Sequence, residues 1–350
     1  MHTILTTVGT SLLTNARRAL EVERLSEHQA LHYLRQTDPV RASAESNSLS
    51  RLLEPGDAIV LIHSQTDDGK FCAESLRKHY VGRGFRSEVG EIVDLSYKES
   101  RFKMRGLRAL VSTLVELIRA HRKEGRQVLI NATGGFKAEI AYATLVGLLF
   151  DVPVYYIHEI FNEIIEMPPT PVGWDHTLIA ENEEFFEWLS EEMRTSAEVA
   201  QRTRALPHEV HLLLAEEEGY TFLSAAGEAF FESYRDRLAR AQAVPVLLSR
   251  PAGEAYRTAA PDTRRMFDRI LSKLRIRELR RSGSDQVRNC DCFIFPKGNR
   301  DGRVFYVEGA EGALRVLEMA RHSDESYERL IDRGVKPESY DTFLPYAETV

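Results

Sequence analysis

The sequence has few of the residues that mark secreted, metal-binding or membrane-spanning proteins. Only three of its 350 residues are cysteines, too few for a disulfide framework. Cys290 and Cys292 have no second ligand pair nearby, so a structural zinc site is not expected. No apolar run approaches the roughly 20 residues of a membrane span, and we recognise no secretory leader. We therefore expect a cytoplasmic protein with no membrane contact, no metal and no cofactor.

The composition is that of an ordinary globular protein, but its charge is unevenly distributed. Hydrophobic residues make up 43% and charged residues 28% of a chain with net charge −7. Residues 261–305 contain 12 Lys and Arg against 6 Asp and Glu, a net of +6. Residues 306–350 contain 5 against 10, a net of −5. The basic segment indicates either an anion-binding surface or a solvated helix face.

Short segments rich in Val and Ile alternate with helical patterns through the first half of the chain. The expected strands cover residues 2–8, 57–64, 87–93, 126–132 and 152–160. In "RGLRALVSTLVELIRAHRK", apolar residues from Leu107 to Ile118 form one stripe of a helix. Strands that alternate with helices predict an α/β fold, with a parallel sheet covered by helices on both faces.

Two glycine-containing motifs follow the first and fourth expected strands. They are "TVGTS", with Gly9, Thr10 and Ser11, and "NATGGFK", with Asn131, Thr133, Gly134, Gly135 and Lys137. Glycine admits close backbone approach, and a helix N-terminus and a lysine both favour anions. Because ligands bind at the carboxyl ends of parallel strands, the motifs predict one pocket for a phosphorylated ligand such as a nucleotide. Neither motif is a dinucleotide fingerprint or a P-loop, and each glycine could instead serve a tight turn.

A third junction follows the second expected strand. The segment "HSQTDDGK" places Ser64 and Gln65 where they could line the same pocket. Helix capping explains these two residues almost as well. The ligand pocket therefore depends mainly on the two glycine motifs.

The two glycine motifs together resemble those of CARF domains, the CRISPR-associated sensor domains with a Rossmann-like fold. The resemblance covers about residues 1–165, and we expect a first domain at residues 1–168. It implies a homodimer that binds one cyclic oligoadenylate of four or six units, of which we expect cyclic tetra-adenylate. The ligand contacts that it implies are the motif residues named above. A symmetric ring suits a two-fold interface, because both protomers can contact it identically.

Residues 169–250 are expected to form a helical linker with a winged-helix-like part. The segment "PPTPVGW" at 168–174 interrupts the pattern. Residues 207–241 then show a short helix, a strand-like "EGYTFLS" and a second helix. Winged helices bind nucleic acid in many proteins, but this segment is acidic, which favours a dimerising spacer.

Residues 251–350 are expected to form a small α+β domain with an antiparallel sheet. A basic amphipathic helix is predicted at 262–281. The segments "NCDCFIFPK" and "GRVFYVEG" then alternate like antiparallel strands. The next segment, "GALRVLEMA", fits either a third strand or a helix, and "ESYERLIDRGV" fits a terminal helical turn.

This outline resembles the RelE toxins, which are ribosome-dependent mRNA interferases, over about residues 255–340. In "GRVFYVE" Arg303 opens a strand, and in "MARHSDESYERLI" Arg321 precedes Tyr327 by six positions. Many relatives carry a pair of lysines where this chain reads "CFIFPK", so Lys297 and Arg300 are candidate substitutes. The whole chain then resembles a sensor–interferase fusion of type III CRISPR antiviral defence.

The RelE resemblance implies metal-independent cleavage of mRNA on the ribosome. The 2′-OH of the RNA attacks the adjacent phosphate, which requires a base, cations for the developing charge and an acid. Arg303 and Arg321 suit the charge, because guanidinium groups match phosphate oxygens. Tyr327 could stack on a base or assist proton transfer, and Lys297 is the candidate base or phosphate clamp.

Two other functions stay open at this point. Arg315 and His322 fit the R-x(4–6)-H spacing of HEPN ribonucleases, which cut free RNA. A HEPN domain is an all-helical bundle, whereas "CDCFIFPKGNRDGRVFYVEG" favours strands. A ligand-responsive DNA-binding regulator would need a basic recognition helix, and residues 207–241 are acidic.

Overall fold

The chain folds into two compact units. The computed structural model describes residues 1–95, 105–157, 163–169, 174–286, 289–298, 300–309 and 312–347. One unit comprises Met1–Val172 and Glu184–Ser233, and the other comprises Gly173–Glu183 and Tyr234–Val350. Residues 169–172 and 184–233 of the expected linker thus belong to the first unit, and its remainder belongs to the second. Within the described ranges, no helix is long and apolar enough to cross a membrane.

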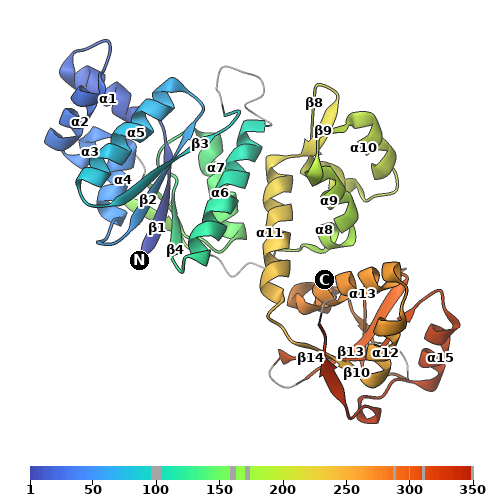
Figure 1. Cartoon of the computed structure of the whole chain (residues 1–350). Coiled ribbons are helices and arrows are strands. Elements are labelled where there is room, and N and C mark those ends of the chain that lie inside the picture. The colour runs from blue at the N-terminus through green and yellow to red at the C-terminus, as the bar shows by residue number, and fades with distance from the viewer. Residues whose placement is uncertain are drawn as a thin grey trace. The chain divides into compact units, whose positions relative to one another are not determined.

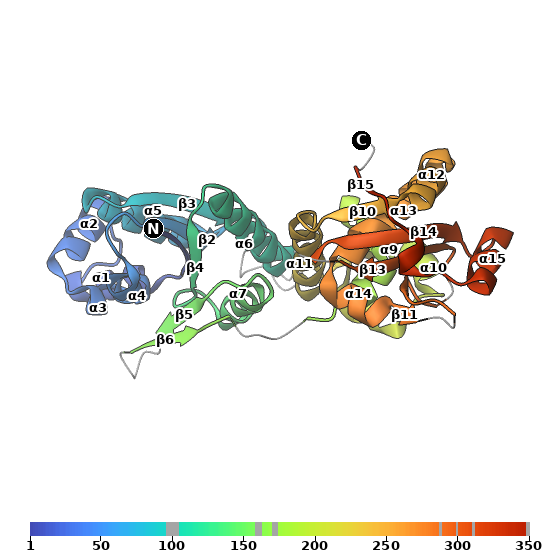
Figure 2. The ribbon, with the colours of Figure 1, turned by 90° about the horizontal axis from the view of Figure 1, so that it is seen from below.

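The first unit contains a six-stranded sheet. Its strands are β1 (His2–Val8), β2 (Ala58–Ser64), β3 (Arg86–Ile92), β4 (Gln127–Asn131), β5 (Val154–Ile157) and β6 (Ile164–Met167). Their order is β3-β2-β1-β4-β5-β6, and β1 to β5 pair in parallel. The expected α/β fold with a parallel sheet is confirmed. The edge strand β6, which runs antiparallel to β5, was not predicted (Figure 2), and residues 158–160 of the fifth expected strand lie outside the described residues.

Helices cover both faces of this sheet. They are α1 (Ser11–Leu20), α2 (Glu27–Gln36), α3 (Pro39–Ala42), α4 (Ala44–Leu52), α5 (Asp67–Gly82), α6 (Arg105–Lys123) and α7 (Lys137–Leu149). On one face, Leu12, Leu49 and Leu76 pack against Ile4 and Ile59 in a single apolar core. On the other face lie α6 and α7 (Figure 1), and the apolar stripe predicted for α6 is buried.

The strand order brings two loops of this sheet together. From β1 the chain proceeds to β2 and β3 on one side, and it then returns to β4 on the other side of β1. The loops that follow β1 and β4 therefore leave the carboxyl edge of the sheet next to each other. This reversal of strand order is the position at which open α/β sheets bind ligands.

Residues 184–233 add a small antiparallel sheet to the first unit. The elements of this region are α9 (Glu183–Glu191), β7 (Arg194–Thr195), α10 (Ser196–Thr203), η2 (His208–Leu213), β8 (Leu214–Glu217), β9 (Tyr220–Leu223) and α11 (Ala225–Ala241). Their strands pair in the order β7-β9-β8. Three arginines of α6 form ion pairs with this region: Arg105 with Glu217 (2.9 Å), Arg108 with Glu228 (2.8 Å) and Arg119 with Glu232 (2.5 Å). These pairs explain why the segment belongs to the first unit.

The second unit contains a sheet of its own. Its strands are β10 (Val246–Ser249), β11 (Asp285–Gln286), β12 (Phe293–Phe295), β13 (Gly302–Glu308), β14 (Leu314–Arg321) and β15 (Phe343–Pro345). Their order is β11-β12-β13-β14-β10-β15, with β12, β13 and β14 antiparallel and β10 parallel to β14. The segment "GALRVLEMA", for which a strand and a helix were both open, is the strand β14.

Helices cover both faces of the second sheet. The helices of this unit include α8 (Thr177–Glu181), α12 (Arg250–Thr258), α13 (Pro261–Arg275), α14 (Arg277–Gly283), α15 (Glu325–Arg333) and the 3₁₀ helix η4 (Pro337–Ser339). On one face Phe267 of α13 packs in a core with Val304. On the other, Leu330 of α15 packs in a core with Phe305.

The single basic helix predicted at 262–281 is instead two helices. The chain is extended at Ile276, between α13 and α14. Arg280 is buried, and its Nη1 donates hydrogen bonds to the carbonyls of Leu274 (3.0 Å) and Arg275 (3.4 Å). This side chain caps the end of α13, so the helix ends earlier than the amphipathic pattern suggests.

Candidate functional sites

The two glycine motifs meet at the carboxyl edge of the first sheet. A side chain at Gly9 would lie only 2.9 Å from the backbone nitrogen of Gly135, so the two loops are in contact. The Thr7 hydroxyl adds a bridge, because it donates a hydrogen bond to the carbonyl of Gly134 at 2.5 Å. The structure thus brings together the loops that were expected to share one pocket.

A buried carboxylate that the sequence analysis missed lies between these loops. Glu45 of α4 is 0% exposed. Its Oε1 accepts a hydrogen bond from the backbone N–H of Gly9 (2.8 Å), and its Oε2 accepts one from the Ser11 hydroxyl (3.1 Å). A side chain at Gly134 would collide with this carboxylate and lie 2.5 Å from the carbonyl of Thr7. Packing within the chain is therefore sufficient to require glycine at position 134.

Glu45 was missed because its neighbours carry no apolar pattern. It lies in "RASAESNSLS", whose small polar residues suggest an exposed segment. In the structure, however, Ser46 and Ser48 of the same helix are buried. A lone acidic residue among small polar residues gives no signal that distinguishes burial from exposure.

Other predicted ligand residues also bond inside the protein. Asn131 is buried, and its side-chain amide donates to the Ser48 hydroxyl at 2.8 Å. The Thr133 hydroxyl donates to Asn131 Oδ1 at 2.8 Å. Ser64 is buried, and its hydroxyl lies 3.1 Å from that of Thr66. These side chains shape the loops and hold them against the sheet.

We call the carboxyl edge of the sheet, where the loops after β1, β2 and β4 lie, the crevice, after the usual ligand position in open α/β sheets. Its solvent-facing residues are chemically mixed. Thr10, Gln65 and Lys137 are exposed. Phe136, which the sequence analysis did not select, precedes Lys137 at the start of α7, and its side chain is 49% exposed. An aromatic ring beside a lysine can stack on a nucleobase while the lysine binds a phosphate. The exposed rim thus suits a nucleotide better than the glycines and hydroxyls do, since most of these are packed or hydrogen-bonded within the chain.

In the second unit, the predicted residue Arg321 lies at the end of β14. Arg321 Nε donates to Asp301 Oδ2 at 2.7 Å, and the Ser323 N–H donates to Asp301 Oδ1 at 3.2 Å. Hydrogen bonds from Ser323 and Arg321 lower the pKa of Asp301, and Asp301 raises the pKa of Arg321. The Arg321 and Asp301 side chains are 43% and 38% exposed. Because Nε is engaged, the terminal amino groups of Arg321 are the part that can bind a phosphate oxygen.

A tight turn follows Arg321 and leads to Tyr327 in the first turn of α15. The Asp324 N–H donates to the carbonyl of Arg321 (3.1 Å), and the Tyr327 N–H donates to the carbonyl of Asp324 (3.0 Å). The Tyr327 ring lies 4.8 Å from the ring of His322 and 6.1 Å from that of Phe305, centroid to centroid. These contacts hold the ring beside the end of β14.

Arg303 is placed differently from Arg321. It is only 3% exposed, and its guanidinium donates hydrogen bonds to the carbonyls of Gly298 and Gly302. In the β13–β14 ladder it pairs with Ala320, whereas Arg321 pairs with Gly302. Because successive residues of a strand point to opposite faces, the two arginines lie on opposite faces of the sheet.

The remaining two predicted residues lie on the loop before β13. The Lys297 side chain is exposed, and its backbone N–H donates to the carbonyl of Gly283 at 2.7 Å. Arg300 is exposed and donates to the carbonyl of Glu181 at 3.3 Å. In this loop the Gly298 carbonyl accepts a hydrogen bond from Arg303, and the Asp301 carboxylate accepts one from Arg321. The sequence analysis did not select Asp301.

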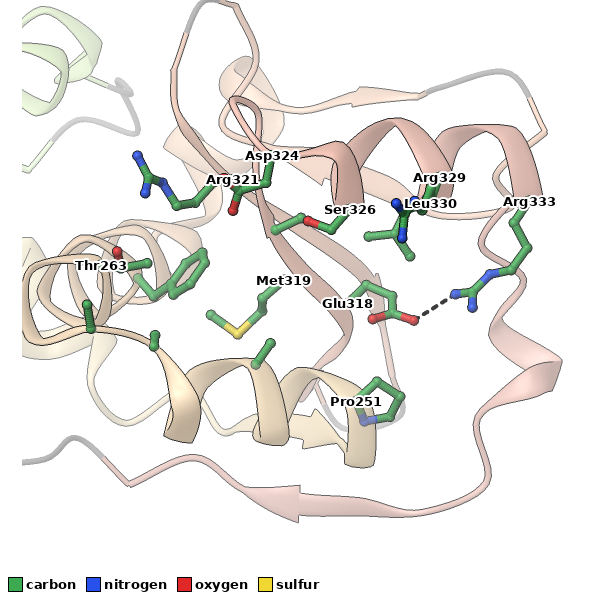
Figure 3. Close-up of a pocket in the computed structure, with 15 residues that line it drawn as sticks. Pro251, Thr263, Glu318, Met319, Arg321, Asp324, Ser326, Arg329, Leu330 and Arg333 are labelled. Carbon is green, nitrogen blue, oxygen red and sulfur yellow. Dashed lines mark hydrogen bonds and ion pairs between the residues drawn. The ribbon is translucent and has the colours of Figure 1, made fainter.

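A groove with a volume of about 940 Å³ opens beside Arg321. One wall is formed by α12 and the start of α13, and the other by α15 (Figure 3). Met319 lies between the walls, and Arg329 and Arg333 project from α15. Glu318 on β14 forms an ion pair with Arg333 at 2.9 Å, drawn as a dashed line in Figure 3.

The first unit matches a family of known proteins over part of its length. Residues 40–170 match the family model described as CRISPR-associated protein (Cas_APE2256). The matched segment includes the strands β2 to β6 and covers less than half of the chain.

Two solved structures are similar at low sequence identity. Protein VC1899 from Vibrio cholerae is 12% identical over 69% of this chain and 68% of its own, with a TM-score of 0.26. Can2 from Sulfobacillus thermosulfidooxidans, solved in complex with cyclic tetra-adenylate, is 11% identical over 69% and 67%, with a TM-score of 0.25. TM-scores of this size do not establish a shared fold.

Proposed function

We propose that this protein is an endoribonuclease of type III CRISPR defence that a cyclic oligoadenylate activates. It acts in the cytoplasm as a homodimer, binds cyclic tetra-adenylate at the first sheet, and cuts ribosome-bound mRNA without a metal. The observation that carries the proposal is the meeting of the β1 and β4 loops at the reversal of strand order. The match to a CRISPR-associated family, which covers β4 and its loop, supports this assignment.

The exposed rim of the crevice provides the ligand contacts in this proposal. Phe136 stacks on an adenine, Lys137 binds a phosphate, and Thr10 and Gln65 supply hydrogen bonds. The remaining motif residues hold the two loops in place through contacts inside the chain. A second protomer supplies the same groups across a two-fold axis, which matches the symmetry of the ring.

The residues at the end of β14 provide the chemistry in this proposal. The 2′-OH of the RNA attacks the adjacent phosphate and expels the 5′-oxygen of the next nucleotide. Arg321 stabilises the charge that develops on the phosphate, and Tyr327 stacks on a neighbouring base. Lys297 is the candidate base, with Arg300 as a further cation. Arg303 can contact substrate only after the carbonyl of Gly298 moves away from its guanidinium.

Two structural features disfavour the alternative functions. A HEPN ribonuclease requires a helical bundle, but Arg315 lies on strand β14 and His322 follows its end, in a unit built around a sheet. A winged-helix DNA-binding regulator requires a basic recognition helix. The corresponding element here is the six-residue 3₁₀ helix η2, followed by the acidic strand β8 with Glu216 and Glu217.

The proposal is tested by one RNA cleavage assay. The full-length protein is incubated with mRNA, with and without ribosomes, with cyclic tetra-adenylate or cyclic hexa-adenylate, and with EDTA. We expect cleavage of ribosome-bound mRNA that requires cyclic tetra-adenylate and persists in EDTA. Equal cleavage of naked RNA would contradict the interferase assignment. Cleavage that is independent of both rings would contradict the sensor assignment, and its loss in EDTA would contradict a metal-free mechanism.

The ligand site is tested separately by calorimetric titration with cyclic tetra-adenylate. We expect Lys137→Ala and Phe136→Ala each to weaken binding about ten-fold or more, because stacking on one base contributes about 1–3 kcal/mol. Lys70→Ala is the matched control, since Lys70 is an exposed lysine in the first turns of α5. Unchanged affinity in both rim variants would show that the ring binds elsewhere.

A further inference from the structure

The groove beside Arg321 has two walls of different chemistry. Arg329 and Arg333 line it from α15, and Arg321 lies at the end of β14, before α15 begins. Ala255 of α12 and Ala259, which follows this helix, line the opposite wall. Two of the three lining arginines therefore lie on the α15 side, which also carries Asp324, and the other side presents mostly small apolar side chains.

The floor of the groove is largely apolar, with Glu318 of β14 as a charged member. Phe267, Met319 and Leu330 contribute to its lining. The floor follows β14 beyond its partner β10, whose last paired residue on β14 is Val316. The second half of β14 is thus the base of an open channel between α12 and α15.

We propose that this groove binds a short segment of single-stranded RNA next to the phosphate that Arg321 holds. A single strand has a charged backbone on one side and flat, largely apolar bases on the other. The backbone can face the arginines of α15, and the bases can face the apolar wall and floor. Arg329 and Arg333 are separated by one helical turn, a rise of about 6 Å, so they can bind successive phosphates. The volume of about 940 Å³ lies at the upper end of the range for ligand pockets. The inference rests on the proposed ribonuclease function, because it assigns the substrate path of that same site.

The carboxylates near the two α15 arginines do not prevent phosphate binding. Arg329 pairs with Glu325 at 2.6 Å, and the two side chains are 77% and 83% exposed. Such exposed pairs are weak, so a phosphate can replace Glu325. Arg333 pairs with Glu318, but Glu318 also accepts a hydrogen bond from the Tyr340 hydroxyl at 2.8 Å. Glu318 therefore keeps a partner when Arg333 turns toward a phosphate.

The inference is tested by RNA binding to the full-length protein at several salt concentrations. The probe is a fluorescent, 2′-O-methylated single-stranded RNA, which lacks the attacking hydroxyl, with cyclic tetra-adenylate at saturation. Each phosphate contact on a single strand contributes about −0.7 to the slope of log K against log [salt]. We expect the double variant Arg329→Gln, Arg333→Gln to lower the magnitude of that slope by about 1.4 and the affinity at least ten-fold.

Two further variants separate the groove from the general charge of the protein. Arg265→Gln is the matched control, because Arg265 is 75% exposed and pairs with Asp262 on its own helix, α13, away from the groove lining. We expect this variant to keep the slope and the affinity of the wild-type chain. Asp324→Asn removes a negative charge from the groove lining and should strengthen binding.

The outcomes distinguish this inference from the proposed function. Absence of RNA binding by the wild-type chain, an unchanged slope in the α15 double variant, or an equal loss in Arg265→Gln would each overturn the groove assignment. A chain that still cuts ribosome-bound mRNA in that case retains the proposed function. Conversely, RNA binding that depends on Arg329 and Arg333, without ring-dependent cleavage, supports the groove and contradicts the proposed function.

Discussion

Charged residues occupy different environments in the two candidate sites. One site is the crevice of the first sheet, and the other is the end of β14, where Arg321 pairs with Asp301 and which we call the Arg321 corner. In the crevice, Glu45 is fully buried, and both of its oxygens accept hydrogen bonds from the chain itself. At the corner, the Asp301 and Arg321 side chains are more than one third exposed. Loss of a hydrogen-bond or ion-pair partner lowers stability strongly when the charge is buried and only weakly when it is exposed. We therefore expect substitutions in the crevice to act first on stability, and substitutions at the corner to act on activity.

The largest expected effect is on cleavage, from Arg321→Ala. Removal of one donor to the developing negative charge should slow ring-dependent mRNA cleavage by about 10²–10³-fold. The melting temperature and the affinity for cyclic tetra-adenylate should stay unchanged, because the side chain is half exposed and lies in the other unit. Arg303→Ala is the contrast, since loss of this buried guanidinium leaves the carbonyls of Gly298 and Gly302 without their donor and should lower the melting temperature. If Arg321→Ala lowers the melting temperature as much as Arg303→Ala does, the exposed and the buried arginine contribute equally to stability, contrary to our expectation.

The next effect is on folding, from Glu45→Ala. The change leaves the N–H of Gly9 and the hydroxyl of Ser11 without their acceptor, and we expect the first unit to lose about 3 kcal/mol of stability. Glu45→Gln retains an oxygen acceptor and should lose less. Glu54→Ala, at an exposed position just after α4, is the control. Calorimetric unfolding measures all three, and a stable Glu45→Ala protein would show that this carboxylate is not a structural group.

The third prediction concerns acid sensitivity, which should arise from a buried group and not from the exposed corner. Burial, and secondarily the charge of Arg237, lowers the pKa of His176 from 6.5 to about 4. The neutral ring therefore stabilises the second unit fully above pH 6.5, and this contribution is lost as the pH falls from 6.5 to 4. A difference of about 2.5 pKa units corresponds to up to about 3 kcal/mol. Melting temperatures between pH 7 and pH 4 should fall less steeply in His176→Gln than in the wild-type chain.

Asp301→Asn provides the matching test at the corner. Because the pKa of Asp301 lies below its usual value of 3.8, its carboxylate stays charged throughout this pH range. Its contribution is lost only as the pH falls below that value, so the variant should not alter the slope between pH 7 and pH 4. If the melting temperature of Asp301→Asn falls less steeply with pH than that of the wild-type chain, the exposed Asp301–Arg321 pair contributes more to stability than we expect.

Among the substitutions that should destabilise the first unit, Gly134→Ala should have a smaller effect than Glu45→Ala. The added methyl group would lie 2.5 Å from the carbonyl of Thr7 and would press on Glu45, and we expect a loss of about 2 kcal/mol. Gly82→Ala is the matched control, because the space around Gly82 in α5 is open. Thermal unfolding of both variants gives the comparison. If Gly134→Ala is as stable as the wild-type chain but no longer binds cyclic tetra-adenylate, the glycine serves the ligand and not the packing of the loops.

Elements with a local apolar pattern could be predicted from the sequence. The five parallel strands begin within two residues of their expected positions, because a run of Val and Ile marks a buried strand without reference to the rest of the chain. The stripe of α6 was equally clear. The end of α13 could not be predicted in this way, because it depends on the buried side chain of Arg280.

The same distinction applies to the candidate sites. The meeting of the β1 and β4 loops follows from a general rule about parallel sheets, so the motifs alone were sufficient to predict it. The exposure of Phe136 and the role of Asp301 required the folded chain. Phe136 lies within "NATGGFK", but the motif does not show whether its ring faces solvent.

Local pattern thus decided which segments are strands and helices and which loops meet. Whether a polar side chain faces solvent or the interior was decided only when distant segments packed together. Glu45 lies 36 residues from Gly9 along the chain and touches it only in the fold. Arg303 is buried because the loop at Gly298 folds over it. Burial depends on every element that surrounds a residue, and a linear pattern describes only its neighbours along the chain.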